Sequence, residues 1–219
     1  MLPNAWDAAS ARAVVAAGFP VVATTSAGVA EALGYEDHQC APAEEMFAAA
    51  ARIVRSVEVP VTVDFEAGYW LEPAELVAVL NEAGAAGCNL EDTDHSTESL
   101  RDVDEHAAWL RRVRDADRTL VINARVDVFL TGDGDVEHAL RRARAYFDVG
   151  VDCVYPIMLA DRAVLARFVA EAGGPVNVLA NAGPVAELAA LGVARVSHGG
   201  LLYRQTMEQF ARSLDALSG

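Results

Sequence analysis

The stretch PVTVDFEAGY, residues 60–69, joins the pattern of a buried strand to two acids at its end. Alternating valines followed by a phenylalanine are typical of a strand that helices cover. Asp64 and Glu66 depart from that pattern, because a carboxylate that is buried without a partner loses its hydration at a large cost in free energy. We therefore interpret this stretch as a strand of a parallel sheet that ends in a functional site.

Short β-branched segments alternate with longer stretches of helical period along the whole chain. The predicted strands cover residues 2–4, 20–24, 59–64, 87–91, 119–125, 151–156, 176–180 and 194–197. The predicted helices cover residues 7–17, 43–56, 73–84, 103–115, 135–147, 161–172, 184–191 and about 201–217. This alternation predicts an α/β fold in which residues 1–219 form a single (β/α)8 barrel domain of the TIM type. An open doubly wound sheet is the alternative, but PNAWDAASA, at the end of the first strand, lacks a glycine-rich phosphate turn.

The composition limits the possible partners and compartments. The chain has 219 residues, 53% of them hydrophobic, and a formal net charge of −15. Such an acidic surface repels phosphate backbones, so we expect no nucleic-acid partner. No apolar segment is long enough to cross a bilayer, and the first residues, MLPNAWD, lack the pattern of a secretory signal. With three scattered cysteines and no disulfide framework, these features predict a cytoplasmic protein without a membrane partner.

All 17 basic residues are arginines, and the chain contains no lysine. A Schiff-base aldolase and a pyridoxal phosphate enzyme both need a lysine amine. A phosphate loop of the Walker type needs one as well. The sequence therefore excludes these mechanisms for this chain.

The predicted strand ends carry acids that converge. In a barrel of this kind, the functional groups lie at the carboxyl ends of the strands. Side-chain alternation places Asp64 and Glu66 on the inward face of one strand and Glu91 on that of the next. Three converging carboxylates repel one another unless a cation lies among them or they share protons. Oxygen ligands suit Mg²⁺, or Mn²⁺, so we predict a metal site here, with structural ion pairs as the alternative.

Other polar residues near the predicted strand ends are candidates for the same site. Arg125 lies on the inward face of its strand and is suited to a bidentate clamp on a substrate anion. The small residues 24–28 form either a flexible loop or a set of donors around an anionic oxygen. His95, in the loop after the fourth strand, is the preferred residue for proton transfer. His106 and His138 occur in helical stretches, where we expect them to face solvent.

The segments at these strand ends occur in a recognisable order. They read LPNAWDAASAR, GFPVVATTSAGVAEALGYED, VPVTVDFEAGY, GCNLEDT, INARVDVFL and GVARVSHGGLLYR. Together they resemble the isocitrate lyase/phosphoenolpyruvate mutase superfamily over nearly the whole chain. The resemblance implies a modified (β/α)8 barrel that binds Mg²⁺ and a 2-oxo acid and cleaves or forms C–C or C–P bonds through an enolate-like state. It also implies a homo-oligomer, dimer or tetramer, in which the helix at about 201–217 packs against a partner subunit.

The resemblance assigns roles to particular residues. Asp64 matches the acid that touches the metal, and Glu66 and Glu91 match acids that hold it, commonly through water. Asp37 matches a loop acid near the metal and the substrate. The residues matched to substrate binding are Trp6, Thr25, Ser26, Ala27, Arg125 and Asn177, and those matched or proposed for catalysis are Thr25, Ser26, Asp37, Arg125 and His95.

The loop after Glu91 departs from the family pattern. It reads DTDHSTESLRDVDEH and is short, without the cysteine acid of isocitrate and methylisocitrate lyases and without the lid lysine of the mutases. Leu179 and Asn181 stand where isocitrate lyase has serines. The chain is therefore predicted to be a divergent member, a Mg²⁺-dependent C–C lyase that acts on a small 2-oxo acid through a metal-stabilised enolate. Oxaloacetate decarboxylation and methylisocitrate lyase-like cleavage are the examples.

Two alternatives to the lyase remain open. The first is a mutase or hydrolase that acts on the C–P bond of phosphonopyruvate or carboxyphosphonoenolpyruvate. The second is a non-catalytic barrel that binds a 2-oxo acid, which the atypical lid favours and the complete set of acids disfavours.

Overall fold

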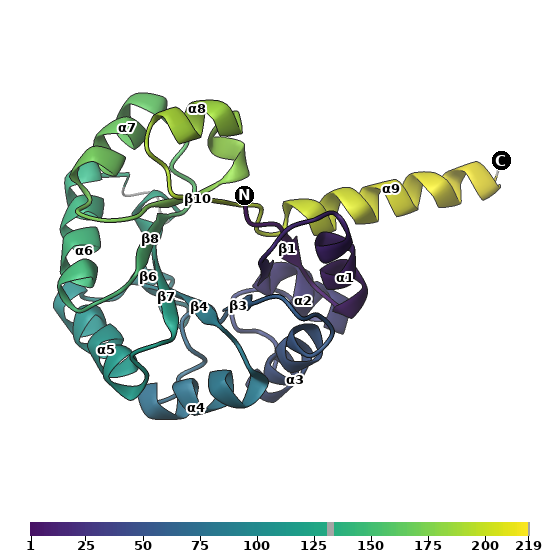
Figure 1. The fold of residues 1–219 in the computed structure, drawn as a ribbon, viewed down its shortest axis with the longest axis horizontal. Helices are drawn as coiled ribbons and strands as arrows, with labels where there is room; N and C mark the ends of the chain where they lie inside the picture. Colours follow the sequence, from purple (N-terminus) through teal and green to yellow (C-terminus); the bar gives the residue numbers. More distant parts are fainter. Residues whose placement is uncertain (131–133, 219) are drawn as a thin grey trace.

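The computed structural model describes residues 1–130 and 134–218, which form a ring of parallel strands surrounded by helices (Figure 1). The strands of the ring are β1 (Asn4–Ala5), β2 (Val22–Thr24), β3 (Val61–Asp64), β4 (Gly87–Glu91), β7 (Val121–Val126), β8 (Cys153–Pro156), β9 (Asn177–Leu179) and β10 (Arg195–Ser197). Each of the predicted strands is present, and the TIM-type barrel is confirmed.

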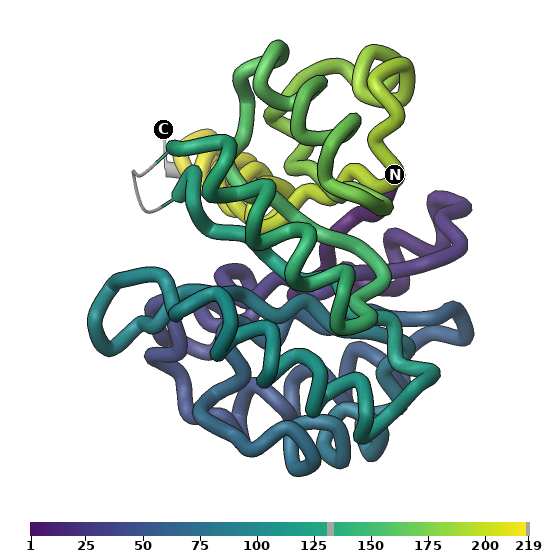
Figure 2. Tube along the Cα trace, turned by 90° about the vertical axis from the view of Figure 1, so that its left-hand side faces the viewer, coloured from purple at the N-terminus to yellow at the C-terminus, as the bar shows by residue number. Residues whose placement is uncertain are grey.

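The helices form the outer layer, and in Figure 2 the teal and green helices of the middle of the chain lie in front of the strands. They are α1 (Ala8–Ala16), α2 (Ser26–Leu33), α3 (Ala43–Val54), α4 (Pro73–Ala83), α5 (Val103–Ala116), α6 (Val136–Asp148), α7 (Arg162–Glu171), α8 (Val185–Ala190) and α9 (Leu201–Ser218). Two short 3-10 turns, η1 (Asp127–Phe129) and η2 (Ala180–Ala182), follow β7 and β9. Within the described ranges, no helix is both long and apolar enough to span a membrane.

The ring is closed by two single bridges. Strands β1, β2, β3, β4, β7 and β8 pair in parallel in that order, and β9 pairs with β10. Val154 bridges to Val176, which joins β8 to the β9 strand, and Leu2 bridges to Ser197, which returns the sheet to its start. Because all strands run the same way, their carboxyl ends meet at one end of the barrel.

Two elements near that end were not predicted. Residues 26–33 form α2 instead of a flexible loop, and Thr25 caps it by accepting a hydrogen bond from the backbone N–H of Gly28. The loop after β4 folds into an antiparallel hairpin, β5 (Thr93–Asp94) with β6 (Ser99–Leu100). Both are too short for a hydrophobic period to reveal them in the sequence.

Helix α9 differs from the other helices because most of it projects away from the barrel (Figure 1). Its start is attached to the strands: the Asn4 side-chain oxygen accepts hydrogen bonds from the backbone N–H groups of His198, at 2.8 Å, and Gly199, at 3.0 Å. The Asn4 amide nitrogen donates to the Thr24 carbonyl at 2.6 Å. A single buried asparagine thus links β1, β2 and the turn that precedes α9.

Candidate active site

A cavity of about 200 Å³ opens at the carboxyl ends of the strands and collects most of the predicted residues. Those that line it are Thr25, Ser26, Ala27, Asp37, Asp64 and Arg125. A cavity smaller than the 300–1,000 Å³ that is typical of drug-sized ligands suits a small acid. The structure therefore brings these predicted residues together at the carboxyl ends of the strands.

Asp64 is the carboxylate at the wall of the cavity. Its backbone N–H donates to the Thr24 hydroxyl at 2.8 Å, which fixes the end of β3 against β2. One carboxylate oxygen, Oδ2, accepts weak hydrogen bonds from Ser26 N at 3.4 Å and Ser26 Oγ at 3.3 Å. The other, Oδ1, is buried and has no hydrogen bond among the described residues. Burial raises the pKa of Asp64, the Arg125 charge opposes this, and the Asp37 charge adds to it.

Glu66 reaches the acid cluster in a different way from the one predicted. Strand β3 ends at Asp64, and Glu66 lies in the following turn with a left-handed backbone, φ +49°. Such a conformation is strained for a residue other than glycine and occurs preferentially at functional sites. Its carboxylate accepts hydrogen bonds from the Gln39 backbone N–H at 2.6 Å and from the Tyr69 hydroxyl. Burial raises the pKa of Glu66 to about 8, although the Tyr69 hydrogen bond opposes this shift.

Glu91, at the end of β4, lies between a cation and an imidazole. One oxygen pairs with the Arg125 guanidinium, and the other with Nε2 of His95. Burial raises the pKa of Glu91, and Arg125 counteracts the rise. Burial by itself would lower the pKa of His95, but its hydrogen bond to Glu91 and the Glu91 charge raise it overall. His95 is thus bonded to the acid cluster, as its position in the loop after β4 predicted.

The donor set suits a divalent cation. Glu66, Glu91 and His95 each offer a ligand atom, and these atoms lie within 4.8 Å of one another. Asp64 is not part of this compact group among the described residues, although it contributes the orphaned, buried Oδ1 nearby. The carboxylate oxygens of this set suit Mg²⁺ or Mn²⁺, whereas an imidazole is a ligand more typical of Zn²⁺ or Fe²⁺. His95 therefore adjoins the predicted ligands Glu66 and Glu91, while Asp64 lies apart from the other two acids.

Arg125 is held in place by a second carboxylate that the sequence reasoning did not single out. Asp127 accepts hydrogen bonds from Arg125 Nε at 2.6 Å and Nη2 at 2.7 Å, a bidentate pair in which both residues are buried. The Thr93 hydroxyl donates to Asp127 at 2.6 Å. The attraction of Arg125 outweighs burial and keeps the pKa of Asp127 low. Arg125 is therefore fixed between Glu91 and Asp127. For Glu91, this pairing agrees with the alternative stated above, in which the predicted acids form structural ion pairs with arginines.

This pair continues into a buried polar network behind the site. The Asp127 backbone N–H donates to Asp92 Oδ1 at 2.9 Å. Asp92 Oδ2 accepts from Arg142 at 3.0 Å and from the Tyr146 hydroxyl at 2.6 Å. Burial raises the pKa of Asp92 to about 6, and the nearby Asp127 charge contributes to the rise. The network connects β4 and β7 to α6 and makes the inner side of the cavity rigid.

Some predicted residues lie outside the cavity lining. Asn177 is one layer behind it, where its amide nitrogen donates to Ser197 Oγ at 3.2 Å, and Ser197 lines the cavity. His95 lines an adjoining cavity of about 410 Å³ that shares Asp37 and His38 with the site. The His38 and His95 rings lie 5.1 Å apart, so His38 stands between His95 and the cavity wall.

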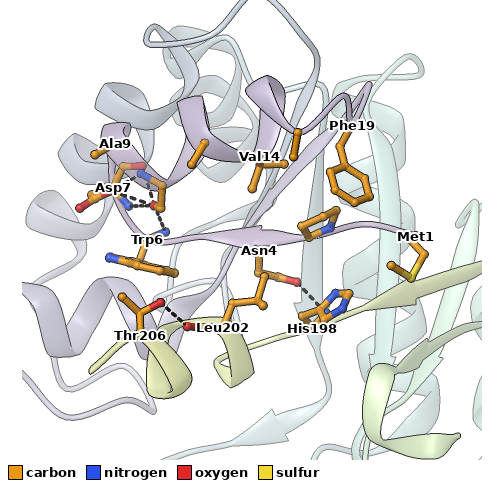
Figure 3. A pocket seen from close by; sticks show the side chains of 14 residues that line it. Met1, Asn4, Trp6, Asp7, Ala9, Val14, Phe19, His198, Leu202 and Thr206 are labelled. Carbon is orange, nitrogen blue, oxygen red and sulfur yellow. Dashed lines mark hydrogen bonds between the residues drawn. The ribbon is translucent and has the colours of Figure 1, made fainter. Parts of the chain in front are cut away.

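Trp6 belongs to a different cavity of about 590 Å³, between α1 and the start of α9 (Figure 3). Its ring meets the Tyr203 ring edge-on at a centroid distance of 5.3 Å. This larger cavity is mainly apolar and contains none of the clustered acids. The cavity at the strand ends is therefore the candidate active site despite its smaller size, and Trp6 does not line it.

Sequence reasoning missed several contributors because they act from loops or through the backbone. Gln39 supports Glu66 through its main chain, while its side-chain oxygen accepts a hydrogen bond from Tyr69 N at 2.6 Å. Tyr155 and Arg204 line the cavity from β8 and α9. A strand-end reading could have found Tyr155, which lies next to the end of β8, but no sequence pattern indicates the others.

The expectation that His106 and His138 face solvent was wrong. His106 is 1% exposed and packs between the Trp109 and Tyr146 rings. Its ring nitrogens have no hydrogen bond among the described residues. His138 is half-buried and accepts a hydrogen bond from Arg142 Nε at 3.0 Å. Ring packing buries His106 on α5, whereas the hydrogen bond from Arg142 draws His138 on α6 toward the polar network.

Comparison with known proteins identifies the family to which this barrel and its acid-lined cavity belong. The chain belongs to the phosphoenolpyruvate phosphomutase family, whose sequence profile matches residues 1–218. The superfamily resemblance read from the strand ends is thus confirmed.

The relatives of the chain include an uncharacterized protein and a probable lyase. The chain is 36% identical over 220 residues to the uncharacterized protein Rv1998c of Mycobacterium tuberculosis, covering 100% of this chain and 84% of that protein. It is 31% identical over 191 residues to the probable 2-methylisocitrate lyase 2 of Corynebacterium glutamicum, covering 82% of this chain and 61% of that one.

Solved structures agree with this placement. A protein of Burkholderia cenocepacia assigned as a phosphonomutase has a TM-score of 0.92 and 44% identity, with 98% of this chain and 92% of that chain covered. Oxaloacetate acetylhydrolase in complex with oxalate has a TM-score of 0.89 and 25% identity, with 99% and 81% covered. Members of this superfamily are lyases, mutases and hydrolases.

Proposed function

We propose that the chain is a Mg²⁺-dependent lyase that cleaves a C–C bond of a small 2-oxo acid. The observation that carries this proposal is that Asp64 and Arg125 line one small cavity, while Glu91 pairs with Arg125 and Glu66 offers a ligand atom within 4.8 Å of one from Glu91. Glu66 and Glu91, with Asp64 beside them, would hold the cation. When bound, Mg²⁺ supplies Lewis-acid polarisation of the carbonyl group of the substrate. The cytoplasmic location stays a prediction.

The residues of the chain perform the remaining tasks. The first turn of α2 presents the Ser26 N–H and hydroxyl and the Ala27 backbone to the substrate carboxylate and carbonyl oxygens. Arg125, locked by Asp127, orients an anionic group of the substrate without first having to be ordered. When the bond breaks, the enolate carbon needs a proton. In this proposal the His38–His95 pair holds it at the mouth of the cavity.

Product-resolved turnover tests the proposal. The purified chain with Mg²⁺ is given oxaloacetate, 2-methylisocitrate and phosphonopyruvate in turn, and proton and phosphorus NMR follow the products. We expect turnover of a C–C substrate, its loss in Arg125→Gln, and its retention in Arg118→Gln, which removes the same charge from an exposed position. Turnover of phosphonopyruvate alone would overturn the lyase assignment.

C–P chemistry is the second candidate, and the 44% identical relative assigned as a phosphonomutase favours it. Phosphonopyruvate carries the same 2-oxo acid group, so the same cavity residues would bind it. A barrel that binds 2-oxo acids without catalysis is the third. Magnesium titration calorimetry that reveals tight, 2-oxo acid-dependent binding without any turnover would support it.

We also propose that α9 packs against a second copy of the chain. Met207, Phe210 and Leu214 are 44%, 55% and 48% exposed and follow one another at helical spacing, so they form one apolar stripe on the projecting helix. The apolar cavity between α1 and α9 is a suitable receptor on the other copy.

Light scattering after gel filtration tests this packing and should give the mass of a dimer or a larger oligomer. Phe210→Asp should shift the chain to a monomer, and Gln205→Asp on the same helix should leave the oligomer unchanged. A wild-type monomer would contradict this.

A further inference from the structure

Arg204 lines the candidate active site from α9, an element that carries none of the predicted site residues. It lies in the first turn of that helix. Leu202 and Thr206, on another face of the helix, line the larger apolar cavity instead. The first two turns of α9 therefore separate the two cavities and present a guanidinium to the smaller one.

Gly200 makes room for this guanidinium. A Cβ atom at position 200 would lie only 2.8 Å from Arg204 Nη1, so the arginine head occupies the space a side chain would fill. The same Cβ position lies 3.7 Å from the Cβ of Ala27, in the first turn of α2. Arg204 is thus placed beside the segment to which we assign the carboxylate and carbonyl oxygens of the substrate.

The two arginines of the cavity differ in their charge balance. Arg125 is neutralised by Glu91 and Asp127, both buried. Arg204 has no carboxylate partner among the described residues, although the cavity wall includes Asp37 and Asp64. A cation that faces a cavity without a partner attracts an anionic ligand.

We propose that Arg204 joins Arg125 in binding the second anionic group of the substrate and makes the site selective for dianionic over monoanionic 2-oxo acids. This inference rests on the proposed function, because it assumes that the first carboxylate and the carbonyl oxygen lie at α2. The second anion is a carboxylate on the carbon next to the carbonyl group. A phosphonate offers the same anionic oxygens, and the test separates the two.

Ligand binding without turnover tests the inference. The probes are 3,3-difluorooxaloacetate and 3,3-difluoropyruvate, which differ by one carboxylate, and fluorine NMR titration in the presence of Mg²⁺ gives both dissociation constants. Phosphonopyruvate, which competes with the first probe, forms the third arm. The variants are Arg204→Ala and Arg204→Lys, with Arg212→Ala as the matched control, an exposed arginine two turns further along the same helix.

We expect Arg204→Ala to weaken binding of the dicarboxylate about tenfold, as for a lost hydrogen bond to a charged group, and to change binding of difluoropyruvate less than about twofold. Arg204→Lys should restore part of the affinity, and Arg212→Ala should change neither constant. A loss confined to phosphonopyruvate would overturn the carboxylate assignment. Equal losses for both fluorinated probes, or none, would overturn the role of Arg204. If the wild-type chain binds neither, the proposed function falls together with this inference.

Discussion

Arg125 and Arg204 line the same cavity from two regions that are built in opposite ways. Arg125 emerges from a central strand, is 8% exposed and is fixed by two buried carboxylates. Arg204 emerges from a helix that leaves the barrel, and its side chain is exposed. Buried charge pairs give fixed geometry, whereas an exposed cation keeps its charge available for a ligand. In our proposals the strand side carries out the reaction and the helix side selects the substrate.

The largest expected effect tests whether the strand side carries the reaction. Asp64→Ala removes the carboxylate with the orphaned Oδ1. We expect Mg²⁺ affinity, measured by calorimetry, to fall at least about 100-fold, and kcat/KM for the substrate found by the turnover screen to fall at least about 1,000-fold. Asp115→Asn, an exposed acid on α5, is the control and should behave like the wild type. Unchanged metal affinity in Asp64→Ala would refute the metal site.

The second effect tests the rigidity of Arg125. Asp127→Ala leaves this buried guanidinium with Glu91 as its remaining partner, so we expect the free energy of unfolding to fall by about 3 kcal/mol in urea titration. The double variant Arg125→Met/Asp127→Leu removes both charges and should lose less stability than Asp127→Ala. If the double variant is less stable than the single one, the pair stabilises the fold by itself and is not mainly a positioning device.

The third effect concerns the buried region next to the polar network. Burial lowers the pKa of His106 to about 3, against about 6.5 in an unfolded chain. Between these pH values the unfolded state binds the extra proton, so the His106 contribution destabilises the fold progressively as the pH falls below about 6.5. The slope is up to about 1.4 kcal/mol for each pH unit.

Urea titrations from pH 7 to pH 5 measure this contribution. His106→Leu should show less loss of stability at low pH than the wild type, and the difference between the two curves cancels the carboxylates that they share. If the two curves of unfolding free energy against pH are parallel, His106 takes up its proton while the chain stays folded.

The smallest expected effect tests whether Arg204, on the helix side, depends on the space left by Gly200. Gly200→Ala places a methyl group where the Arg204 guanidinium lies, and a flexible side chain can move aside at little cost in stability. We expect a roughly threefold weaker affinity for 3,3-difluorooxaloacetate and an unfolding free energy within about 0.5 kcal/mol of wild type. Ala211→Ser, at an exposed position further along α9, is the control and should leave the affinity unchanged. An unchanged affinity would show that Arg204 does not depend on this space.

The placement of the candidate side chains was predicted best where a strand end defines the position. Asp64, Glu91 and Arg125 lie on the barrel strands β3, β4 and β7, and the two-residue period of a strand settles which way they point. Glu66 was predicted to join them by the same period, but it lies past the end of β3 in a left-handed turn. It reaches the cluster because backbone N–H and hydroxyl donors from residues 39 and 69 hold its carboxylate.

The sequence by itself determined the barrel, the end of it that carries the acids, and the absence of lysine chemistry, because these follow from local periodicity and composition. Tertiary structure alone decided that Asp127 locks Arg125, that His106 is buried, and that Arg204 faces the cavity. The physical reason is that these arrangements depend on which surfaces meet when distant segments pack. A short-range period carries no information about that.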